Sequence, residues 1–194
     1  MGLRCFVAVE LPEEVRSSVD RVVGPLRETG ADVKWVPADN LHVTLKFLGD
    51  VEPETVEALN EELRKKLSHY RPFYIKIAHM GFFPAGRVPR VLWVGIEDCP
   101  ALSDVQKEVE RAAAGLGFLR EDRPFSPHLT IGRVRSRKGI ERMMTLLMKE
   151  RETVFAELQV RGISLMRSDL KPAGAEYRCV AHIPFEGGTN VEQR

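Results

Sequence analysis

Short apolar runs and alternating apolar and polar positions along the chain predict strands and helices that follow one another closely. Strands are predicted at residues 5–10, 33–36, 41–47, 72–79, 88–96, 128–135, 155–167 and 176–184. Apolar residues recur every three or four positions, which predicts helices, at residues 12–30, 56–67, 102–112 and 139–149. Residues 81–86 are predicted to form a loop. Strands joined by hairpins and helices favour an α+β fold with mainly antiparallel sheets.

Two tetrapeptides share one unusual pattern. His42-Val43-Thr44-Leu45 and His128-Leu129-Thr130-Ile131 each have the form His, apolar, Thr, apolar. Side chains alternate between the two faces of a strand, so each His shares a face with its Thr while the apolar pair packs into the core. Two matched strands that each present an imidazole and a hydroxyl predict a two-fold site for one small anionic centre.

The composition limits the partners and the compartment. The 29 basic and 28 acidic residues give a net charge of +1, which argues against a protein that coats long duplexes and permits binding of one phosphate or strand end. Three cysteines without a C-x-x-C pair favour a reducing cytoplasm and disfavour a metal site or a catalytic cysteine. The apolar stretch at residues 5–9 is too short for a signal peptide or a membrane span, so no membrane association is expected.

The residues around the tetrapeptides carry a family resemblance. The segments concerned are 40–49 (NLHVTLKFLG), 124–133 (PFSPHLTIGR), 4–12 (RCFVAVELP), 89–95 (PRVLWVG) and 166–170 (MRSDL). The first two resemble the paired signatures of the two-histidine (2H) phosphoesterases. Within that superfamily the chain resembles the RNA 2′,3′-cyclic phosphodiesterases, also called 2′-5′ RNA ligases.

The resemblance implies an architecture as well as an activity. It implies two pseudo-symmetric lobes of mainly antiparallel sheet, with helices on the outside and a central cleft between them. Each lobe contributes one His-Thr strand to the cleft. We expect residues 1–186 to form this single bilobal domain and residues 187–194 to form a polar C-terminal tail. We also expect a monomer.

Paired histidines suit the hydrolysis of a strained cyclic phosphate. One group must deprotonate water and another must protonate the departing sugar oxygen, and an unperturbed histidine with a pKa near 6.5 can do either. The hydroxyls of Thr44 and Thr130 can bind the phosphate oxygens. This scheme requires no metal and no cofactor. The resemblance assigns His42 as the proton donor and His128 as the proton acceptor, whereas the near-symmetric motifs by themselves do not.

A phosphate-binding cation is also predicted. The family places a phosphate-contacting arginine five residues after the second histidine, which is Arg133 here. Strict alternation from His128 would turn Arg133 to the opposite face, and a bulge at Gly132 would bring it back. We expect the bulge. Under regular alternation, Lys46 would instead share a face with His42 and supply the cation, whereas Arg135 would point away.

Several other residues fit structural roles at least as well as functional ones. The remaining histidines are expected to be structural or on the surface: His69, His79 and His182. A nucleobase can stack on an aromatic side chain, although each candidate also fits the core: Trp35, Phe47, Phe83 and Phe125.

The leading hypothesis is an enzyme that hydrolyses RNA 2′,3′-cyclic phosphate ends to 2′-phosphates, with 2′-5′ RNA ligation as the reverse reaction. Its partners would be RNA ends or nucleotides that carry a 2′,3′-cyclic phosphate. One alternative is a 2H phosphodiesterase for a small cyclic phosphate such as ADP-ribose 1″,2″-cyclic phosphate. Another is a non-catalytic module that binds nucleotides or RNA ends, which the presence of both histidines disfavours. A metal-dependent hydrolase lacks a nearby set of carboxylate ligands.

Overall fold

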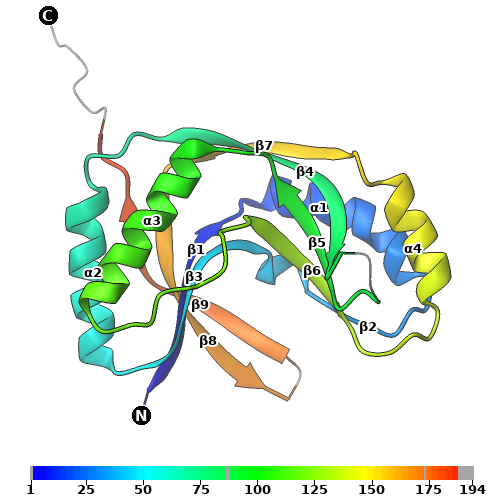
Figure 1. The fold of residues 1–194 in the computed structure, drawn as a ribbon, viewed down its shortest axis with the longest axis horizontal. Helices are drawn as coiled ribbons and strands as arrows, with labels where there is room; N and C mark the ends of the chain where they lie inside the picture. The colour runs from blue at the N-terminus through cyan, green and yellow to red at the C-terminus, as the bar shows by residue number, and fades with distance from the viewer. Residues whose placement is uncertain (1, 86–87, 173, 188–194) are drawn as a thin grey trace, which may run out of the picture.

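The computed structural model describes residues 2–85, 88–172 and 174–187, which form an α+β fold (Figure 1). The strands are β1 (Leu3–Glu10), β2 (Val33–Trp35), β3 (His42–Val51), β4 (Phe73–Phe83), β5 (Val91–Ile96), β6 (His128–Val134), β7 (Val154–Val160), β8 (Gly162–Lys171) and β9 (Gly174–Pro184). The helices are α1 (Glu13–Arg27), α2 (Pro53–Leu67), α3 (Pro100–Gly115) and α4 (Ile140–Lys149), with a 3₁₀ turn at Ala38–Asn40. The predicted fold class is therefore confirmed.

Prolines mark the starts of three helices. Pro53 and Pro100 are the first residues of α2 and α3, and Pro12 directly precedes α1. Proline suits these positions because its missing N–H would have no partner in the first turn and its φ angle already fits a helix. Pro25 lies inside the last turn of α1, which continues to Arg27. Among the described helices, none is long and apolar enough to span a membrane.

The strands form one curved sheet in the order β7-β4-β5-β6-β3-β1-β8-β9, with β2 paired to β6. Every strand pairing in the described sheet is antiparallel. The two motif strands meet at its centre, where the pairing of β3 with β6 is a single residue pair, Val43 with Leu129. This short seam divides the sheet into a half with β1, β3, β8 and β9 and a half with β2, β4, β5, β6 and β7.

Two of the described helices, α1 and α3, pack against the half of the sheet opposite to the strand that precedes them. Helix α1 follows β1 but packs against β7 and α4 in the other half. Helix α3 leaves β5 and packs against α2 and β3. Figure 1 shows the result, with α2 and α3 covering one end of the curved sheet and α1 and α4 the other. This exchange ties the halves together, and residues from both belong to one buried apolar cluster.

The predicted strand at residues 155–167 is wrong. Two strands, β7 and β8, occupy this stretch with Arg161 between them, and they pair with β4 and β1 in opposite halves. Apolar residues flank the break closely on both sides, so the prediction joined the two strands although Arg161 and Gly162 interrupt the apolar pattern. Gly162 is the first residue of β8. A side chain does not fit at this position, because a Cβ atom would lie 2.5 Å from the carbonyl oxygen of Ile183.

Two other boundaries differ from the predictions. Strand β4 runs through Phe83, so the first part of the predicted 81–86 loop is strand, while residue 86 lies outside the described residues. The predicted polar tail was placed from residue 187, yet the Gly187 backbone N–H donates a hydrogen bond to the Tyr70 carbonyl at 2.8 Å. Residues 188–194 lie outside the described part of the chain.

Candidate active site

The two histidines and two threonines of the motifs share one face of the sheet. Val43 and Leu129 pair directly and are fully buried on the opposite face. Extending this antiparallel register by one residue in each direction places His42 across from Thr130 and Thr44 across from His128. The two imidazoles are therefore diagonal neighbours, a relation that separates residues by roughly 7–8 Å. A tetrahedral phosphate fits between groups at this spacing.

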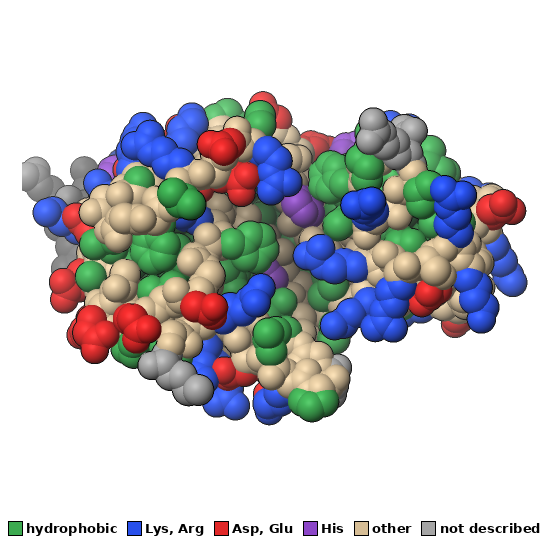
Figure 2. Space-filling view, turned by 60° about the horizontal axis from the view of Figure 1, so that its bottom comes forward, with side chains coloured by type: hydrophobic (Ala, Val, Ile, Leu, Met, Phe, Trp, Pro, Cys, Tyr) green, Lys and Arg blue, Asp and Glu red, His purple; other side chains and the backbone are tan. Residues whose placement is uncertain are grey.

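Four of the five predicted site residues line one cavity of about 290 Å³: His42, Thr44, Thr130 and Arg133. His128 lines a separate cavity of about 430 Å³ instead, so the expectation that both histidines line one cavity is not met, although they lie on neighbouring strands. The two rings are electrostatically coupled: burial lowers the pKa of His42, and His128 adds to this lowering. Figure 2 shows histidine side chains in a hollow between the two ends of the molecule, with lysine and arginine side chains around it.

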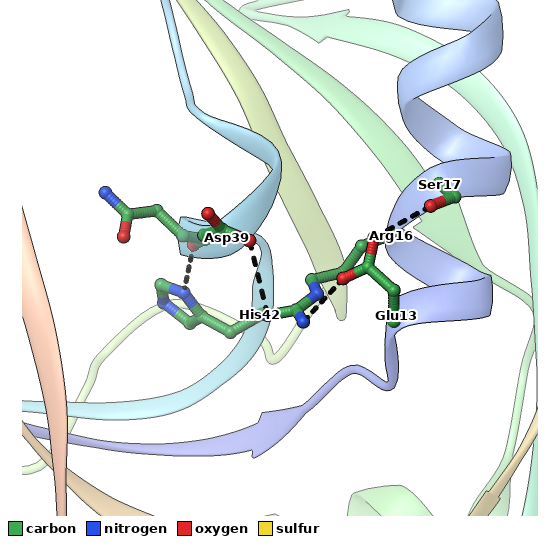
Figure 3. A network of polar contacts seen from close by, with 6 residues as sticks. Glu13, Arg16, Ser17, Asp39 and His42 are labelled. Atoms are coloured by element: carbon green, nitrogen blue, oxygen red, sulfur yellow. Dashed lines mark hydrogen bonds and ion pairs between the residues drawn. The ribbon is translucent and has the colours of Figure 1, made fainter.

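His42 is oriented by the turn that precedes it. Its Nδ1 lies 2.8 Å from the Asn40 carbonyl oxygen, which can only accept, so Nδ1 carries the proton and Nε2 is free to face the site. The Asn40 side chain donates to the Ala175 carbonyl at 2.8 Å and so anchors the turn to β9. Figure 3 shows the second anchor, Arg16 of α1, whose Nη1 lies 3.8 Å from Asp39 of the same turn.

His128 is held in the same manner. Its Nδ1 lies 2.7 Å from the carbonyl oxygen of Ser126, again two residues before the histidine, so the same nitrogen of each ring is left for chemistry. The surroundings of the rings differ. His42 contacts Phe6 and Tyr177, with ring centroids 4.7 and 5.3 Å away, whereas His128 meets the edge of Phe83 at 5.3 Å.

Burial lowers the pKa of His42 below the usual value for histidine. The hydrogen bond to the Asn40 carbonyl opposes this shift, and the charge of the nearby His128 adds to it. The neutral ring of His42 is therefore favoured in the ligand-free protein. A bound phosphate anion acts in the opposite direction, because a negative charge favours the protonated imidazole.

The predicted bulge beside Gly132 is present in β6. Thr130 pairs with Trp93 and Gly132 pairs with Leu92, which leaves Ile131 without a partner in β5. Ile131 and Gly132 are consequently both buried, and Arg133 returns to the face of Thr130 and lines its cavity.

A matching bulge in β3 overturns the expectation for Lys46. Thr44 pairs with Ala8 and Lys46 pairs with Val7, which leaves Leu45 unpaired in β1. Lys46 therefore turns away from the His42 face and is only 6% exposed. Its Nζ donates to Glu110 of α3 at 2.8 Å and to the Leu119 carbonyl at 2.9 Å, so it belongs to the packing of α3 and not to the cavity.

The cavity also contains residues that the sequence interpretation did not select. Arg4 and Phe6 of β1 line it, and the alternation of β1 marks them, because they share a face opposite Cys5 and Val7. Tyr177 of β9 also lines it, more than 130 residues from His42 in the sequence, and no local pattern indicates its presence. Arg4 and Arg133 make the wall cationic, and no Asp or Glu is among the described residues that line this cavity.

Of the remaining histidines, His69 and His182 line neither cavity, whereas His79 lies beside His128. His69 is exposed at the end of α2, and His182 Nδ1 lies 3.2 Å from the hydroxyl of Ser164. His79 lines the cavity beside His128, and its Nδ1 lies 3.1 Å from Glu152. The expectation that His79 is structural or on the surface did not include a place in this cavity.

The four aromatic candidates separate into two groups. Phe47 is 70% exposed and lines the cavity of His42, and Phe83 lines the cavity of His128. Trp35 and Phe125 pack against the buried core. In the described part of the chain, no three His, Cys, Asp or Glu side chains gather in a metal-binding arrangement.

The chain resembles known proteins in sequence and in fold. The profile of the 2′-5′ RNA ligase superfamily matches residues 11–172. An RNA 2′,3′-cyclic phosphodiesterase of Methanothermobacter thermautotrophicus is 37% identical over 177 residues, or 91% of this chain and 96% of that protein. An RNA 2′,3′-cyclic phosphodiesterase of Thermotoga maritima is 30% identical over 186 residues, or 96% of this chain and 97% of that protein.

Solved structures have the same fold. The protein TT0787 of Thermus thermophilus matches with a TM-score of 0.79 and 26% identity, covering 96% of this chain and 100% of that one. E. coli LigT, in a crystal structure with 3′-AMP, matches with a TM-score of 0.76 and 24% identity, covering 95% and 99% of the two chains. At this identity the second likeness concerns the fold alone.

Proposed function

This chain belongs to the 2′-5′ RNA ligase superfamily of two-histidine phosphoesterases, and from that premise we propose that it is an RNA 2′,3′-cyclic phosphodiesterase. It hydrolyses the 2′,3′-cyclic phosphate at an RNA end to a 2′-phosphate and a free 3′-hydroxyl. Running in reverse, the same site joins such an end to a 5′-hydroxyl through a 2′-5′ linkage. The relatives named for this activity resemble the chain over more than nine tenths of its length.

The walls of the His42 cavity suit a phosphate diester. Arg133 and Arg4 supply positive charge without a carboxylate on the described wall, and Thr44 and Thr130 supply hydroxyl donors on the face of the histidines. The Arg133 guanidinium can donate two parallel hydrogen bonds to phosphate oxygens. Fixed donors of this kind stabilise the negative charge that grows on the non-bridging oxygens in the transition state.

The histidines divide the proton transfers. Water attacks phosphorus from the side of His128, and its proton passes to Nε2 of that ring. The bond from phosphorus to O3′ breaks on the opposite side, and O3′ takes the proton carried by Nε2 of His42. The product is a 2′-phosphate, and the two rings have exchanged protonation states. Acid and base catalysis by positioned groups contributes roughly 10² to 10⁴ in rate each.

Because its pKa is lowered, His42 can act as the proton donor only if something favours its protonated form. A proton donor must start protonated, whereas burial favours the neutral ring in the free protein. The anionic substrate meets the requirement, since its negative charge beside the imidazole raises the pKa when it binds. His42 is therefore charged mainly in the complex, and its proton is acquired together with the phosphate.

The observation that carries this proposal is the diagonal pair of histidines beside Arg133, on a wall whose described residues include no carboxylate. The test is incubation in EDTA of three substrates: an oligoribonucleotide with a 2′,3′-cyclic phosphate end, a 2′,3′-cyclic mononucleotide, and ADP-ribose 1″,2″-cyclic phosphate. We expect turnover of the oligoribonucleotide to a 2′-phosphate. Turnover of ADP-ribose 1″,2″-cyclic phosphate alone assigns the small-molecule alternative, and binding without turnover assigns a non-catalytic module.

We propose further that residues 1–186 act as one domain, as a monomer in the cytoplasm. The exchange of α1 and α3 between the halves supports one domain, because each half packs against a helix that follows a strand of the other half. Three cysteines that form no disulfide are compatible with a reducing compartment. Size-exclusion chromatography with light scattering tests the monomer.

A further inference from the structure

The cavity beside His128 differs from the cavity of His42 in charge and in position. It lies over β4, β5 and the start of β6, on the side of β6 that faces away from β3. Its charged groups are mutually paired: Glu152 lies 3.6 Å from Arg151 and 3.1 Å from His79. Because these charges compensate one another, this cavity suits an uncharged group better than a phosphate.

Trp93 provides a flat wall within this cavity. It pairs with Thr130 across β5 and β6, so its side chain lies on the same face as the motif residues. A Cβ atom on Gly81 would collide with Cζ2 of the indole, and one on Gly95 would lie 3.2 Å from Cζ3. The two glycines thus leave the room that the indole needs to lie over the sheet, and Phe83 lies beside it with ring centroids 5.3 Å apart. An aromatic surface of this kind stacks well with a nucleobase.

The direction of attack indicates what this cavity holds. Displacement at phosphorus places the attacking and departing oxygens roughly in line. If O3′ departs toward His42, the attacking oxygen approaches from His128, and any group attached to that oxygen extends beyond His128. The cavity of Trp93 occupies this region. We propose that it binds the 5′-terminal nucleoside of a second RNA strand, whose 5′-hydroxyl replaces water. This inference rests on the proposed function.

The step balances without a further reactant. The 5′-oxygen attacks phosphorus and its proton passes to Nε2 of His128, the bond from phosphorus to O3′ breaks, and O3′ takes the proton from Nε2 of His42. The product is a 2′-5′ phosphodiester with a free 3′-hydroxyl. A strand that carries a 5′-phosphate lacks this nucleophile, and the paired charges around Glu152 leave its phosphate without a compensating cation.

The test compares ligation with hydrolysis in one reaction. An oligoribonucleotide with a 2′,3′-cyclic phosphate end is mixed with rising concentrations of a second oligoribonucleotide with a 5′-hydroxyl, and both products are measured. We expect Trp93→Leu to lower the ratio of ligation to hydrolysis about tenfold or more, because stacking is lost. Trp93→Phe keeps an aromatic face and should retain most of the ratio. Tyr74→Leu is the matched control, since Tyr74 is 64% exposed and lines neither cavity.

A binding measurement supplies an independent result. The chain has two tryptophans, so the fluorescence that adenosine quenches in the unchanged protein and not in Trp93→Phe belongs to Trp93. We expect saturable quenching by adenosine and weaker quenching by 5′-AMP. An unchanged ligation ratio in a folded Trp93→Leu protein overturns the inference, and so does an equal loss of both products or a lack of quenching. In each of these cases continued hydrolysis leaves the proposed function intact, whereas a lack of hydrolysis by the unchanged protein removes the proposed function itself.

Discussion

The two motif strands follow one backbone plan and then differ at two side chains. In both β3 and β6 a carbonyl two residues upstream holds the histidine by Nδ1, and in both the residue after the threonine is bulged. The next residue is Lys46 in β3 and Gly132 in β6. The one after that is Phe47 in β3 and Arg133 in β6, and both line the cavity of His42.

These differences make the two sides of an otherwise symmetric site unequal. The shared plan presents two equivalent imidazoles, which is what an acid and a base on opposite sides of phosphorus require. At these positions β6 adds a cation to the cavity and β3 adds an aromatic ring, so the contributions of the two strands are not equivalent. Burial adds to the asymmetry, because it lowers the pKa of His42. Repetition of the strand provides the proposed catalytic pair, and divergence after the bulge makes its two sides different.

The largest expected effect comes from removing what the two strands share. His42→Ala and His128→Ala should each lower kcat about 10²-fold or more on a cyclic-phosphate oligoribonucleotide, because each removes one proton transfer. Thermal unfolding measures whether each variant keeps its fold, and His69→Ala is the control for an exposed histidine. Near-native turnover by either folded variant removes that histidine from the mechanism.

Variants of Arg133 and Phe47 test the difference between β6 and β3 at the second residue after the bulge. Arg133→Ala should lower kcat/KM by about 10²-fold, because the growing charge on phosphate loses a fixed donor. Arg133→Lys keeps the charge but loses the two-pronged geometry, so we expect a loss of about tenfold. Steady-state kinetics on the same oligoribonucleotide measures both variants.

Phe47→Leu is the contrasting change on β3, and it should raise KM for nucleotides with little change in kcat.

If Arg133→Lys matches the unchanged protein, the guanidinium geometry has no role. If Phe47→Leu lowers kcat as strongly as Arg133→Ala, the division of the site into an ionic and an aromatic side is wrong.

A variant of Lys46 tests the difference between Lys46 in β3 and Gly132 in β6, through its effect on the free energy of unfolding. Lys46→Met leaves the largely buried carboxylate of Glu110 without its cation, so the free energy of unfolding should fall by about 2 kcal/mol. Urea denaturation measures this, and turnover should be nearly unchanged because Lys46 lies outside the cavity. Lys107→Met removes an exposed pair with Asp104 on the same helix and should cost less than about 0.5 kcal/mol. A strong loss of turnover in folded Lys46→Met would return Lys46 to the site.

The smallest effect concerns the coupling of the two rings. His128→Ala removes the imidazole whose protonated form disfavours a charge on His42, so the pKa of His42 should rise toward its usual value while burial still holds it below. NMR titration of the imidazole protons measures this, with His182→Ala as the control. A pKa that stays constant or falls contradicts the coupling.

Because the folded state favours the neutral His42, its contribution to stability should be lost as pH falls below about 6.5, where the unfolded ring takes up a proton.

Local patterns predicted the elements that depend on neighbours in sequence. The spacing of Val56, Leu59, Leu63 and Leu67 marks the buried face of α2, and Pro12 marks the start of α1. Alternation in the two motifs placed all four His and Thr side chains on one face, because the strand period holds over three residues regardless of the partner strand.

Local patterns failed where a partner strand intervened. Alternation assigned Lys46 to the His42 face, but pairing with β1 leaves Leu45 bulged and turns Lys46 toward Glu110. In the same way, residues 155–167 look like one strand and divide at Arg161, because β7 and β8 pair with different partners.

By itself the sequence determined that two His-Thr strands exist, that each has a buried and a chemical face, and which family they resemble. Tertiary structure alone decided that the strands lie side by side, that Arg133 rejoins the His128 face, and that Arg4 and Tyr177 complete the wall. The physical reason is the range of the forces involved. Side-chain alternation is set by the geometry of adjacent peptide units, whereas bulges and cavity walls depend on hydrogen bonds and packing between residues far apart in the chain.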